Sequence, residues 1–438
     1  MNLIILGGGE SGVGAAILGK HKGWNVFVSD YGQIQTAFKA ELDQFDIEYE
    51  EEKHTFERIE KADLVIKSPG IPDKVPVIKR LKSLGKEIID EIEFGFRYCE
   101  NAKIIAITGS NGKTTVTGLT HYLLEKAGLK AGIAGNIGFS FAKKVALEQN
   151  DFYVLEVSSF QLDYCTTFRP DIAILINITP DHLDRYDYKM ENYIASKFRI
   201  TQNQTTEDLF IFNKKDQNTQ QFLIETQQQE FLNATKIPVE VIYNQKNIQI
   251  GESQFDTNQI SMKGPHNHFN ATCAVRVAQE LGIRDEVIEE GLATFVNAPH
   301  RLEWIMNIHG IDFINDSKAT NIDSTFQALK AMDQPIIWIA GGQDKGNDYN
   351  ILASLVKEKV KALICLCEDN TKLIAAFKDI IPIIQSTKDV NEAVAMSQKL
   401  AQKGEVILLS PACASFDLFK NYIARGDQFR QAVLNINN

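Results

Sequence analysis

The sequence predicts an α/β fold of three domains, each built on a mainly parallel sheet flanked by helices. Three blocks each open with a short apolar strand, pass through a glycine-rich turn and continue into a helix. Strands that alternate with helices form parallel sheets, because the chain must cross over between neighbouring strands. The 438 residues also exceed one hydrophobic core, since domains average roughly 150 residues. We therefore expect domains at 1–92, 93–298 and 299–438.

The first block has the pattern of a Rossmann-like nucleotide-binding domain. An apolar strand at 3–6 runs into the G-x-G-x-x-G spacing of residues 7–12, and the next strand ends at Asp30. Glycines let the backbone approach a diphosphate, and a carboxylate at this place can accept from a ribose hydroxyl or a base. NAD, another nucleotide and a purely structural turn all fit this pattern, and we favour another nucleotide. A neighbouring strand ends in three residues expected at the same crevice: Ser68, Pro69 and Gly70.

The second block carries the strongest local signal, a phosphate loop between a strand that starts at Lys103 and the helix that follows it. The loop reads TGSNGKTT over residues 108–115. Backbone N–H groups of such a loop cradle phosphate, Lys113 would reach the β- and γ-phosphates, and the Thr114 hydroxyl would ligate Mg²⁺. The full P-loop pattern is not met, because Ile107 stands where its first glycine would be. The alternative is a glycine turn with a solvated lysine.

Two further polar residues follow strands of this second block. Glu156 comes near the end of the strand DFYVLEV, and His182 follows the next strand in TPDHLDR. A carboxylate beside a phosphate loop can hold Mg²⁺. His182 alone could be a surface histidine, but its acidic neighbours and the nearby loop favour the metal site. Lys197 lies on a predicted helix, where composition alone indicates a solvated lysine.

The rest of the chain continues the α/β pattern after one interruption. Residues 201–262 are rich in Gln, Asn and Thr, and we expect an antiparallel edge or side sheet there. The third block starts after a break at 297–300 and is also expected to be Rossmann-like. Polar residues recur where its strands end, and together they indicate a second phosphate or carboxylate site: Arg301, Asp316, Lys318, Lys345 and Ser415.

Composition limits the classes of function. A formal net charge of -11 argues against sequence-independent binding to nucleic acid, which needs a basic face. No stretch approaches the roughly 20 apolar residues that span a bilayer, and the start shows no signal-peptide pattern. The six cysteines lack paired CxxC spacing, and Cys365 and Cys367 fall in an apolar, strand-like run. We therefore expect a cytoplasmic protein with reduced thiols, inserted in no membrane.

Nine motifs, taken in order, resemble one known family. They are TGSNGKTT, VLEVSSFQLD, TPDHLDRY, YIASKFRI, GPHN, HRLE, NDSKATN, GGQDKG and LLSPACASFD. Their order is similar to that of the Mur ligases over essentially the whole chain, and NDSKATN and SPACAS resemble the D-glutamate-adding branch. The resemblance implies an ATP-dependent enzyme that joins D-glutamate to UDP-N-acetylmuramoyl-L-alanine through an acyl phosphate, in peptidoglycan precursor synthesis. It also implies small-molecule partners only, and we expect a monomer.

The resemblance assigns roles to individual residues. It implies that the catalytic residues are Lys113, Glu156, His182 and Lys197. One or two Mg²⁺ would be held by Thr114, Glu156, His182 and Lys197, the last of them carbamylated. The ATP contacts would be Gly109, Ser110, Asn111, Gly112, Lys113, Thr114, Thr115, Asn267, Asn270, Arg301, Asp316 and Lys318. The UDP-substrate contacts would be Ser11, Asp30, Ser68, Pro69, Gly70, Asn136 and His182. The D-glutamate contacts would be Thr320, Lys345, Ser415, Phe416 and Tyr422.

Three other classes compete with this interpretation. An NAD-dependent oxidoreductase would use the first glycine motif but would leave the phosphate loop unexplained. A folylpolyglutamate synthase shares the central and C-terminal machinery but lacks a complete α/β domain ahead of the phosphate loop. A non-catalytic nucleotide-binding scaffold would tolerate the loss of Lys113, whereas a ligase would not.

Overall fold

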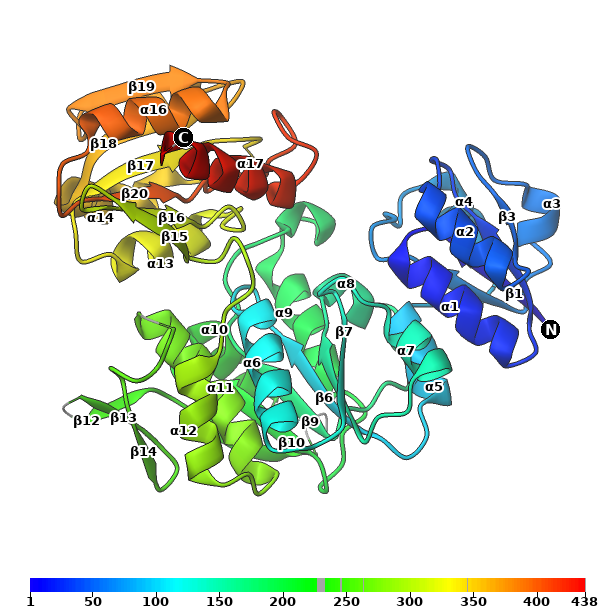
Figure 1. Cartoon of the computed structure of the whole chain (residues 1–438). Helices are drawn as coiled ribbons and strands as arrows, with labels where there is room; N and C mark the ends of the chain where they lie inside the picture. The colour runs from blue at the N-terminus through cyan, green and yellow to red at the C-terminus, as the bar shows by residue number, and fades with distance from the viewer. Residues whose placement is uncertain (227–232, 245, 263, 345, 438) are drawn as a thin grey trace. The chain divides into compact units, whose positions relative to one another are not determined.

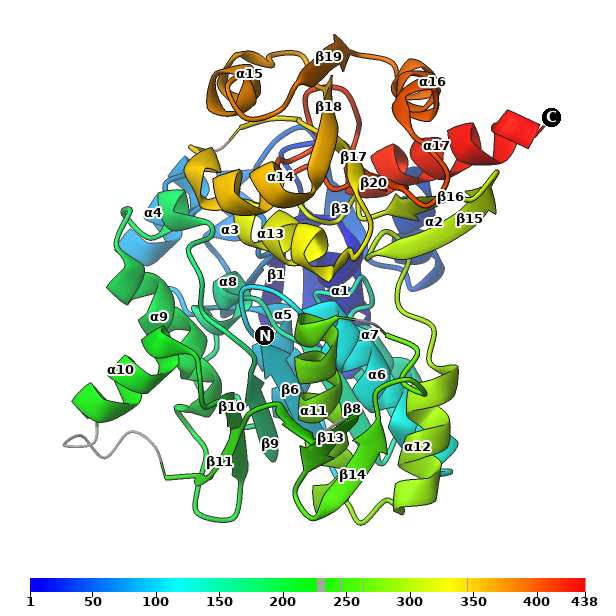
Figure 2. The same cartoon turned by 90° about the vertical axis from the view of Figure 1, so that its left-hand side faces the viewer.

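The computed structural model describes residues 1–226, 233–244, 246–262, 264–344 and 346–437. Contacts divide the chain into two compact units, Met1–Ser261 with His268–Phe295, and Met262–Asn267 with Val296–Asn438. Figures 1 and 2 show the helices and strands of both units from two sides. Lys345, which was predicted to bind D-glutamate, lies outside the described residues.

The first unit opens with a parallel sheet in the order β3-β2-β1-β4-β5. Its strands are β1 (Asn2–Leu6), β2 (Asn25–Ser29), β3 (Glu48–Glu50), β4 (Leu64–Lys67) and β5 (Ile88–Ile89). The helices between them are α1 (Glu10–His21), α2 (Thr36–Gln44), α3 (Phe56–Ile59) and α4 (Pro76–Ser83). The chain moves outward from β1 in both directions, so the carboxyl ends of β1 and β4 form the switch point at which sheets of this kind hold ligands in a crevice.

Glycines allow the tight entry from β1 into α1. Gly7 has a φ of +100°, and a Cβ there would lie 2.5 Å from Ser68 Oγ. At Gly12 a Cβ would lie 1.9 Å from the carbonyl oxygen of Gly7. A side chain at either position would therefore push the loop away from the sheet, which explains the spacing of the first glycine motif.

A second, six-stranded parallel sheet in the same unit has the order β11-β10-β9-β6-β8-β7. Its strands are β6 (Lys103–Thr108), β7 (Ala131–Gly135), β8 (Phe152–Glu156), β9 (Ile172–Leu175), β10 (Leu209–Asn213) and β11 (Thr235–Val239). The accompanying helices are α5 (Glu91–Tyr98), α6 (Lys113–Lys126), α7 (Phe141–Leu147), α8 (Ser159–Leu162), α9 (Met190–Phe198), α10 (Gln217–Thr226), α11 (Pro265–Glu280) and α12 (Asp285–Thr294), with short 3₁₀ turns at Leu183–Arg185 and Arg199–Thr201. In Figure 2 this sheet lies between α9 and α10 on one side and α6 and α12 on the other.

The prediction of a separate antiparallel sheet for residues 201–262 is partly wrong. The segment at 209–213 is β10, which pairs parallel with β9 and joins the central sheet. Its Phe210, Ile211 and Phe212 are all buried, so this strand is covered on both faces and belongs inside an α/β sheet. Only the later part is antiparallel, as the three strands β12 (Ile242–Asn244), β13 (Asn247–Ile250) and β14 (Ser253–Asp256).

The second unit contains a six-stranded sheet in the order β15-β16-β20-β17-β18-β19. Its strands are β15 (Glu303–Ile308), β16 (Ile311–Asn315), β17 (Ile336–Ala340), β18 (Val360–Leu366), β19 (Ile383–Thr387) and β20 (Val406–Leu409). Only the β15–β16 pair is antiparallel. The helices are α13 (Ile322–Ala331), α14 (Ala353–Lys359), α15 (Thr371–Phe377), α16 (Val390–Leu400) and α17 (Tyr422–Leu434), with 3₁₀ turns at Tyr349–Leu352 and Asn435–Asn437.

Each of the three large sheets is mainly parallel and has helices between its strands, which confirms the predicted fold class. All six cysteines are free, and Cys365 and Cys367 are buried; Cys365 lies in β18 as expected, whereas Cys367 comes directly after its end. Over the part of the chain that the structure describes, no helix is both long enough and apolar enough to cross a bilayer.

Candidate active site

The predicted phosphate loop lies between β6 and α6. Gly112 is the N-cap of α6 with a φ of +87°, and a Cβ there would lie 2.5 Å from the side-chain oxygen of Asn270. This position therefore requires glycine, and the predicted ATP contact Asn270 lies against the loop. The loop meets the start of a 14-residue helix, whose N-terminal N–H groups and dipole favour an anion.

The segment that follows β9 holds the shape of the loop. The backbone N–H of Ser110 donates to the carbonyl oxygen of Asn177, and the N–H of Asn111 donates to Asn177 Oδ1, each at 2.9 Å. Ser110 Oγ donates to the carbonyl oxygen of Thr179 at 2.9 Å and lies 3.1 Å from the Tyr193 hydroxyl. Asn177, Thr179 and Tyr193 were not predicted from the sequence as site residues. A polar residue inside the apolar run AILINITP was the available signal for Asn177.

Two lysines converge on one carbonyl group of the loop. Lys113 Nζ donates to the carbonyl oxygens of Gly109 at 2.7 Å and Ser110 at 2.9 Å. Lys197 Nζ, from α9, donates to the same Gly109 oxygen at 2.8 Å. Lys197 is only 1% exposed, so the interpretation of it as a solvated helix lysine, based on composition alone, is wrong.

The surroundings of Lys197 disfavour its charged form. Burial, and then the nearby charge of Lys113, lower the pKa of Lys197 well below its ordinary value, although Asp181 and Asp163 oppose this. Removing an ammonium group from water and placing it beside another cation both favour the neutral amine. A neutral amine at this place is a nucleophile, which a solvated lysine at neutral pH is not.

Glu156 ends β8 directly beside the phosphate-loop strand, in register with Ile107 of β6. Its side chain is 2% exposed, and Oε1 accepts a hydrogen bond from Asn136 Nδ2 at 2.9 Å. The structure thus brings together two residues that the sequence analysis had assigned to different ligands. His182 follows β9 with a φ of +53°, and its ring packs edge-on against Phe160 with centroids 5.1 Å apart.

These residues fit a magnesium ion bound together with a nucleotide. Among the described residues no cluster of three or more His, Cys, Asp or Glu is arranged to hold a metal by itself. Mg²⁺ is usually bound by one or two carboxylates plus substrate phosphates and water, without a dedicated protein cage. The carboxylate of Glu156 and the hydroxyl of Thr114, in the first turn of α6, are oxygen donors of this kind.

The first crevice has a carboxylate at its centre. Asp30 Oδ2 accepts from the N–H of Gly8 at 2.6 Å, and Asp30 Oδ1 accepts from the N–H of Gly32 at 2.7 Å. Ser11 lies in the first turn of α1. The structure therefore places Asp30 against the glycine loop, which is where an acidic ribose-binding residue stands in nucleotide-binding sheets.

The turn after β4 lies at the same crevice and has a partner that the sequence analysis missed. Ser68 hydrogen-bonds through its N–H to the carbonyl oxygen of Leu6, and Gly70 is exposed. Arg185 donates from Nη2 to the carbonyl oxygen of Pro69 at 3.2 Å, and its guanidinium lies 4.5 Å from the centre of the Phe160 ring. Arg185 thereby links the segment that carries His182 to the turn at 68–70.

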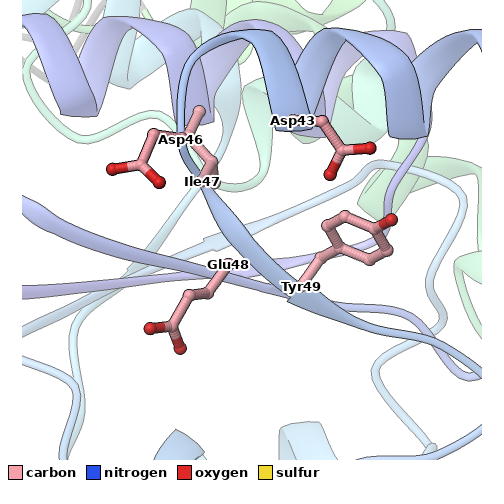
Figure 3. A pocket seen from close by; sticks show the side chains of 5 residues that line it. All are labelled: Asp43, Asp46, Ile47, Glu48 and Tyr49. Carbon is pink, nitrogen blue, oxygen red and sulfur yellow. The ribbon is translucent and has the colours of Figure 1, made fainter.

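A separate hollow on the same unit does not suit a phosphate. It lies beside α2 and β3 and is lined by Asp43, Asp46, Ile47, Glu48 and Tyr49. Figure 3 shows these side chains around the end of α2 and along β3. Three carboxylates line the hollow, two of them paired with Lys20 and Arg58, and its lining residues include no basic group that could hold a diphosphate.

In the second unit, predicted ATP-side residues follow β16. Asp316 is 7% exposed and accepts from the N–H of Leu302 at 3.1 Å and from Ser410 Oγ at 2.9 Å. Burial raises the pKa of Asp316 to about 7, against the hydrogen bonds from Ser410 and Leu302 and the charges of Arg301 and Arg425. This carboxyl is therefore divided between two protonation states at neutral pH.

Lys318 and Tyr422 are brought together although they were assigned to different ligands. Lys318 Nζ lies 5.3 Å from the centre of the Tyr422 ring, and Tyr422 is the first residue of α17. Ser415 is 2% exposed, Phe416 is 65% exposed, and Thr320 is half-buried. Phe416 thus offers an open aromatic surface, whereas the Ser415 side chain is covered. Asn267 is also buried, at the start of α11.

Arg425 joins the loops of this sheet and was also missed by the sequence analysis. It is 1% exposed and donates to Ser317 Oγ, to the carbonyl oxygen of Ser317, and to the carbonyl oxygens of Gly341 and Cys413. These three segments follow β16, β17 and β20 and carry Lys318, the GGQDKG motif and Ser415. The sequence around Arg425 contains no motif that indicates this role.

The comparisons with known proteins agree with this geometry. A MurD N-terminal domain matches residues 3–77, a Mur ligase middle domain matches residues 107–278, and a Mur ligase glutamate ligase domain matches residues 300–413. The three matches follow one another along the chain, and each covers one of the three mainly parallel sheets or most of it.

Full-length relatives and solved structures extend the match. A Christiangramia forsetii protein named UDP-N-acetylmuramoylalanine–D-glutamate ligase is 51% identical over 442 residues, which cover 99% of both chains. A pseudomurein peptide ligase type C from Methanothermus fervidus has the same fold, with a TM-score of 0.64, 18% identity and full coverage of both chains. A MurF ligase from Thermotoga maritima, solved in complex with ADP, matches at a TM-score of 0.61 and 13% identity, over 94% of this chain and 95% of its own. With a relative of this identity matching from end to end, the chain belongs to the Mur ligase family.

Proposed function

We propose that the chain is an ATP-dependent ligase that joins D-glutamate to UDP-N-acetylmuramoyl-L-alanine, with release of ADP and phosphate. The single observation that carries this proposal is the 51% identity, over 99% of both chains, to a relative with that name. The phosphate loop with Lys113, Lys197 and Glu156 around it supports the phosphoryl-transfer half of the reaction. The ADP complex of a family member with the same fold supports the use of ATP.

The chemistry requires activation of a carboxylate. An unmodified carboxylate would have to expel oxide, whereas phosphoryl transfer from ATP gives an acyl phosphate, from which phosphate leaves. Such a transfer depends on positioning and on neutralising charge, and in this proposal Lys113 does both at the β- and γ-phosphates. The glutamate amine then attacks the acyl carbon, and the tetrahedral intermediate collapses to an amide and phosphate.

The proposed metal site draws on the same edge of the central sheet. Thr114, Glu156, His182 and carbamylated Lys197 would hold one or two Mg²⁺, which would neutralise phosphate charge during transfer. The lowered pKa of Lys197 supports the carbamate, because only a neutral amine adds to CO₂. That addition forms an N–C bond and releases one proton, which turns a buried neutral amine into a negatively charged, carboxylate-like group. Asn136 orients the Glu156 carboxylate through its hydrogen bond.

The remaining substrates would bind at the ends of the other two sheets. We propose that residues 1–92 take the UDP end of the acceptor, residues 93–298 take ATP, and residues 299–438 take D-glutamate and part of ATP. The contacts would be those assigned above, and they include Lys345. We also propose that the enzyme acts as a monomer in the cytoplasm, in peptidoglycan precursor synthesis.

The decisive experiment measures ADP and phosphate release by the purified chain with ATP, Mg²⁺, UDP-N-acetylmuramoyl-L-alanine and an amino acid. Turnover is expected with D-glutamate and not with L-glutamate or D-alanine. Lys113→Ala should lose nearly all turnover, with the Lys126→Ala variant, a lysine of the same helix far from its start, as the matched control. Absence of ADP with every reactant present would reject the ligase, and activity with a folate acceptor would favour the folylpolyglutamate synthase alternative.

A further inference from the structure

Two neighbouring aromatic rings lie at the carboxyl end of the first sheet. Tyr31 directly follows Asp30, and its side chain is 76% exposed. The ring of His54, shortly after β3, lies 5.8 Å from it between centroids, with the two planes tilted by 40°. A single exposed aromatic residue is common on protein surfaces. This one, however, stands beside the carboxylate that is hydrogen-bonded to the glycine loop.

A buried hydrogen-bond network determines which nitrogen of His54 carries its proton. Ser29 Oγ donates to Glu50 Oε1 at 2.7 Å, and the same Oγ lies 2.7 Å from His54 Nδ1. A hydroxyl has one hydrogen to donate. Since the carboxylate of Glu50 takes it, the hydrogen between Ser29 and His54 must come from Nδ1.

The charge of Glu50 supports this assignment. Burial alone would raise the pKa of Glu50, but hydrogen bonds from the backbone and side chain of Thr55 and from Ser29 bring it below its ordinary value. Burial lowers the pKa of His54, against the opposing charges of Glu50 and Asp30. At neutral pH the imidazole is therefore neutral and protonated on Nδ1, so Nε2 presents a lone pair. No hydrogen bond to Nε2 occurs within the described ranges of the chain.

We propose that Tyr31 and His54 form the base-recognition element of the first crevice, in which Tyr31 stacks on the base and His54 Nε2 accepts from the imide N3–H of uracil. The inference rests on the proposed function, because it takes the acceptor's UDP end to lie in this crevice. Ser29 and Glu50 are positioning residues, since they act only by fixing the imidazole tautomer.

The element distinguishes bases by chemistry. Uracil carries a hydrogen at N3, which matches the lone pair of Nε2. Cytosine has its own lone pair at N3, so the two acceptors would face each other without a hydrogen. Stacking on Tyr31, in contrast, is open to any base, because every base has a π-face. The two residues therefore contribute separable properties, general affinity from Tyr31 and preference for uracil from His54.

Calorimetric titration of the full chain with UDP and with CDP tests both roles. The wild type is expected to bind UDP about fivefold more tightly than CDP, since one hydrogen bond is worth about 1 kcal/mol and 1.4 kcal/mol is tenfold. His54→Phe keeps a ring but removes the acceptor, and should bring the two affinities within about twofold. Tyr31→Ala should weaken both nucleotides by a similar factor and leave their ratio unchanged.

His21→Phe is the matched control, because His21 is an exposed histidine at the other end of α1, where it packs on Phe45. It should leave both affinities and their ratio unchanged. Equal binding of UDP and CDP by the wild type, or an unchanged ratio in His54→Phe, would overturn the inference. Unchanged affinities for both nucleotides in Tyr31→Ala would overturn the stacking role of Tyr31.

Steady-state kinetics separate this inference from the proposed function. His54→Phe should raise KM for the UDP-linked acceptor several-fold and leave kcat unchanged, because the base lies away from the reacting carboxylate. An unchanged KM with normal turnover would reject base recognition by His54 while the ligase stands. Absence of turnover in the wild type itself would reject the proposed function, whatever the nucleotide ratio.

Discussion

Two buried basic side chains at the ends of two different sheets differ in how they are held. Lys197, beside the phosphate loop, has one hydrogen bond, to the carbonyl oxygen of Gly109, and has Lys113 as a neighbour. Arg425, beneath the loops of the second unit, donates to three carbonyl groups and a hydroxyl. Both side chains are 1% exposed, so burial alone does not distinguish them.

Their protonation does distinguish them. The pKa of Lys197 is lowered well below its ordinary value, whereas burial lowers that of Arg425 only to about 10, because Cys413, Asp417 and Asp316 oppose it. A guanidinium with several acceptors stays charged and fastens three loops. A lysine with one acceptor and a cationic neighbour loses its proton easily and becomes available for chemistry. The difference supports the proposed chemical role of Lys197 and a structural role for Arg425.

Replacing Lys197 by arginine should lower turnover more than any other change proposed for these two side chains. Lys197→Arg keeps a donor that can reach the Gly109 oxygen but cannot form a carbamate. We expect turnover to fall by about 10³-fold, the order of magnitude lost when one charge-stabilising group is removed from an active site. The measurement is ADP release under saturating substrates, with circular dichroism to show that the fold is retained.

Lys197→Ala supplies the complementary test. Short carboxylic acids should restore part of its activity, since they can replace the missing carbamate, and they should not restore Lys197→Arg, whose side chain fills the space. Wild-type activity in Lys197→Arg would remove the chemical role and with it the contrast with Arg425.

Replacing Arg425 by lysine should affect D-glutamate binding and stability more than turnover. Arg425→Lys cannot donate to all of its present acceptors, so at least one buried carbonyl group loses its partner. We expect a loss of about 2–3 kcal/mol in unfolding free energy and a KM for D-glutamate raised about tenfold, with kcat changed less. Arg430→Lys is the matched control, because Arg430 lies on the same helix as Arg425 and forms a partly exposed ion pair with Glu303 of β15. An unchanged KM and melting temperature in Arg425→Lys would show that the loops do not depend on this arginine.

Removal of CO₂ should distinguish the two side chains without any mutation. Turnover of the wild type in degassed buffer should fall several-fold and recover when bicarbonate is added, because a lysine carbamate is in equilibrium with CO₂. Arg425→Lys should respond by the same factor, since its defect lies elsewhere. If bicarbonate has no effect at mildly acidic pH, where the carbamate is least stable, the carbamate proposal fails.

The smallest expected effect concerns the pH dependence of stability near Arg425. The pKa of Asp316 is about 7 in the folded protein, above its ordinary value of 3.8. A raised carboxyl pKa means that the unfolded chain releases this proton first, so the unfolding free energy falls as pH rises from about 4 to about 7 and is level above that. Asp316→Asn cannot titrate, so its melting temperature should fall less than that of the wild type between pH 5 and pH 7, by a few degrees. Parallel melting curves of the two proteins across this range would contradict the assignment.

Several residues of the proposed site were predicted from local sequence. The phosphate loop was predicted because a strand, a glycine turn and a GKTT sequence follow one another within a few residues, and Asp30 because it ends the strand after the first glycine motif. Residues such as Asn177, Tyr193, Arg185 and Arg425 were missed. They act from other segments, and a lone polar residue on a strand end or a helix has no local pattern that identifies its partner.

Local sequence patterns were enough to predict the fold class and the order of the three sheets along the chain, and to propose the loop at 108–115 as the phosphate site. These depend on interactions between residues close in the chain, on hydrophobic periodicity and on the conformational freedom of glycine. The tertiary structure alone decided that β10 joins the central sheet, that Lys197 is buried beside Lys113, and that His54 presents a lone pair. Each of these depends on burial and on hydrogen bonds between distant segments, and those set pKa values and tautomers that no local pattern encodes.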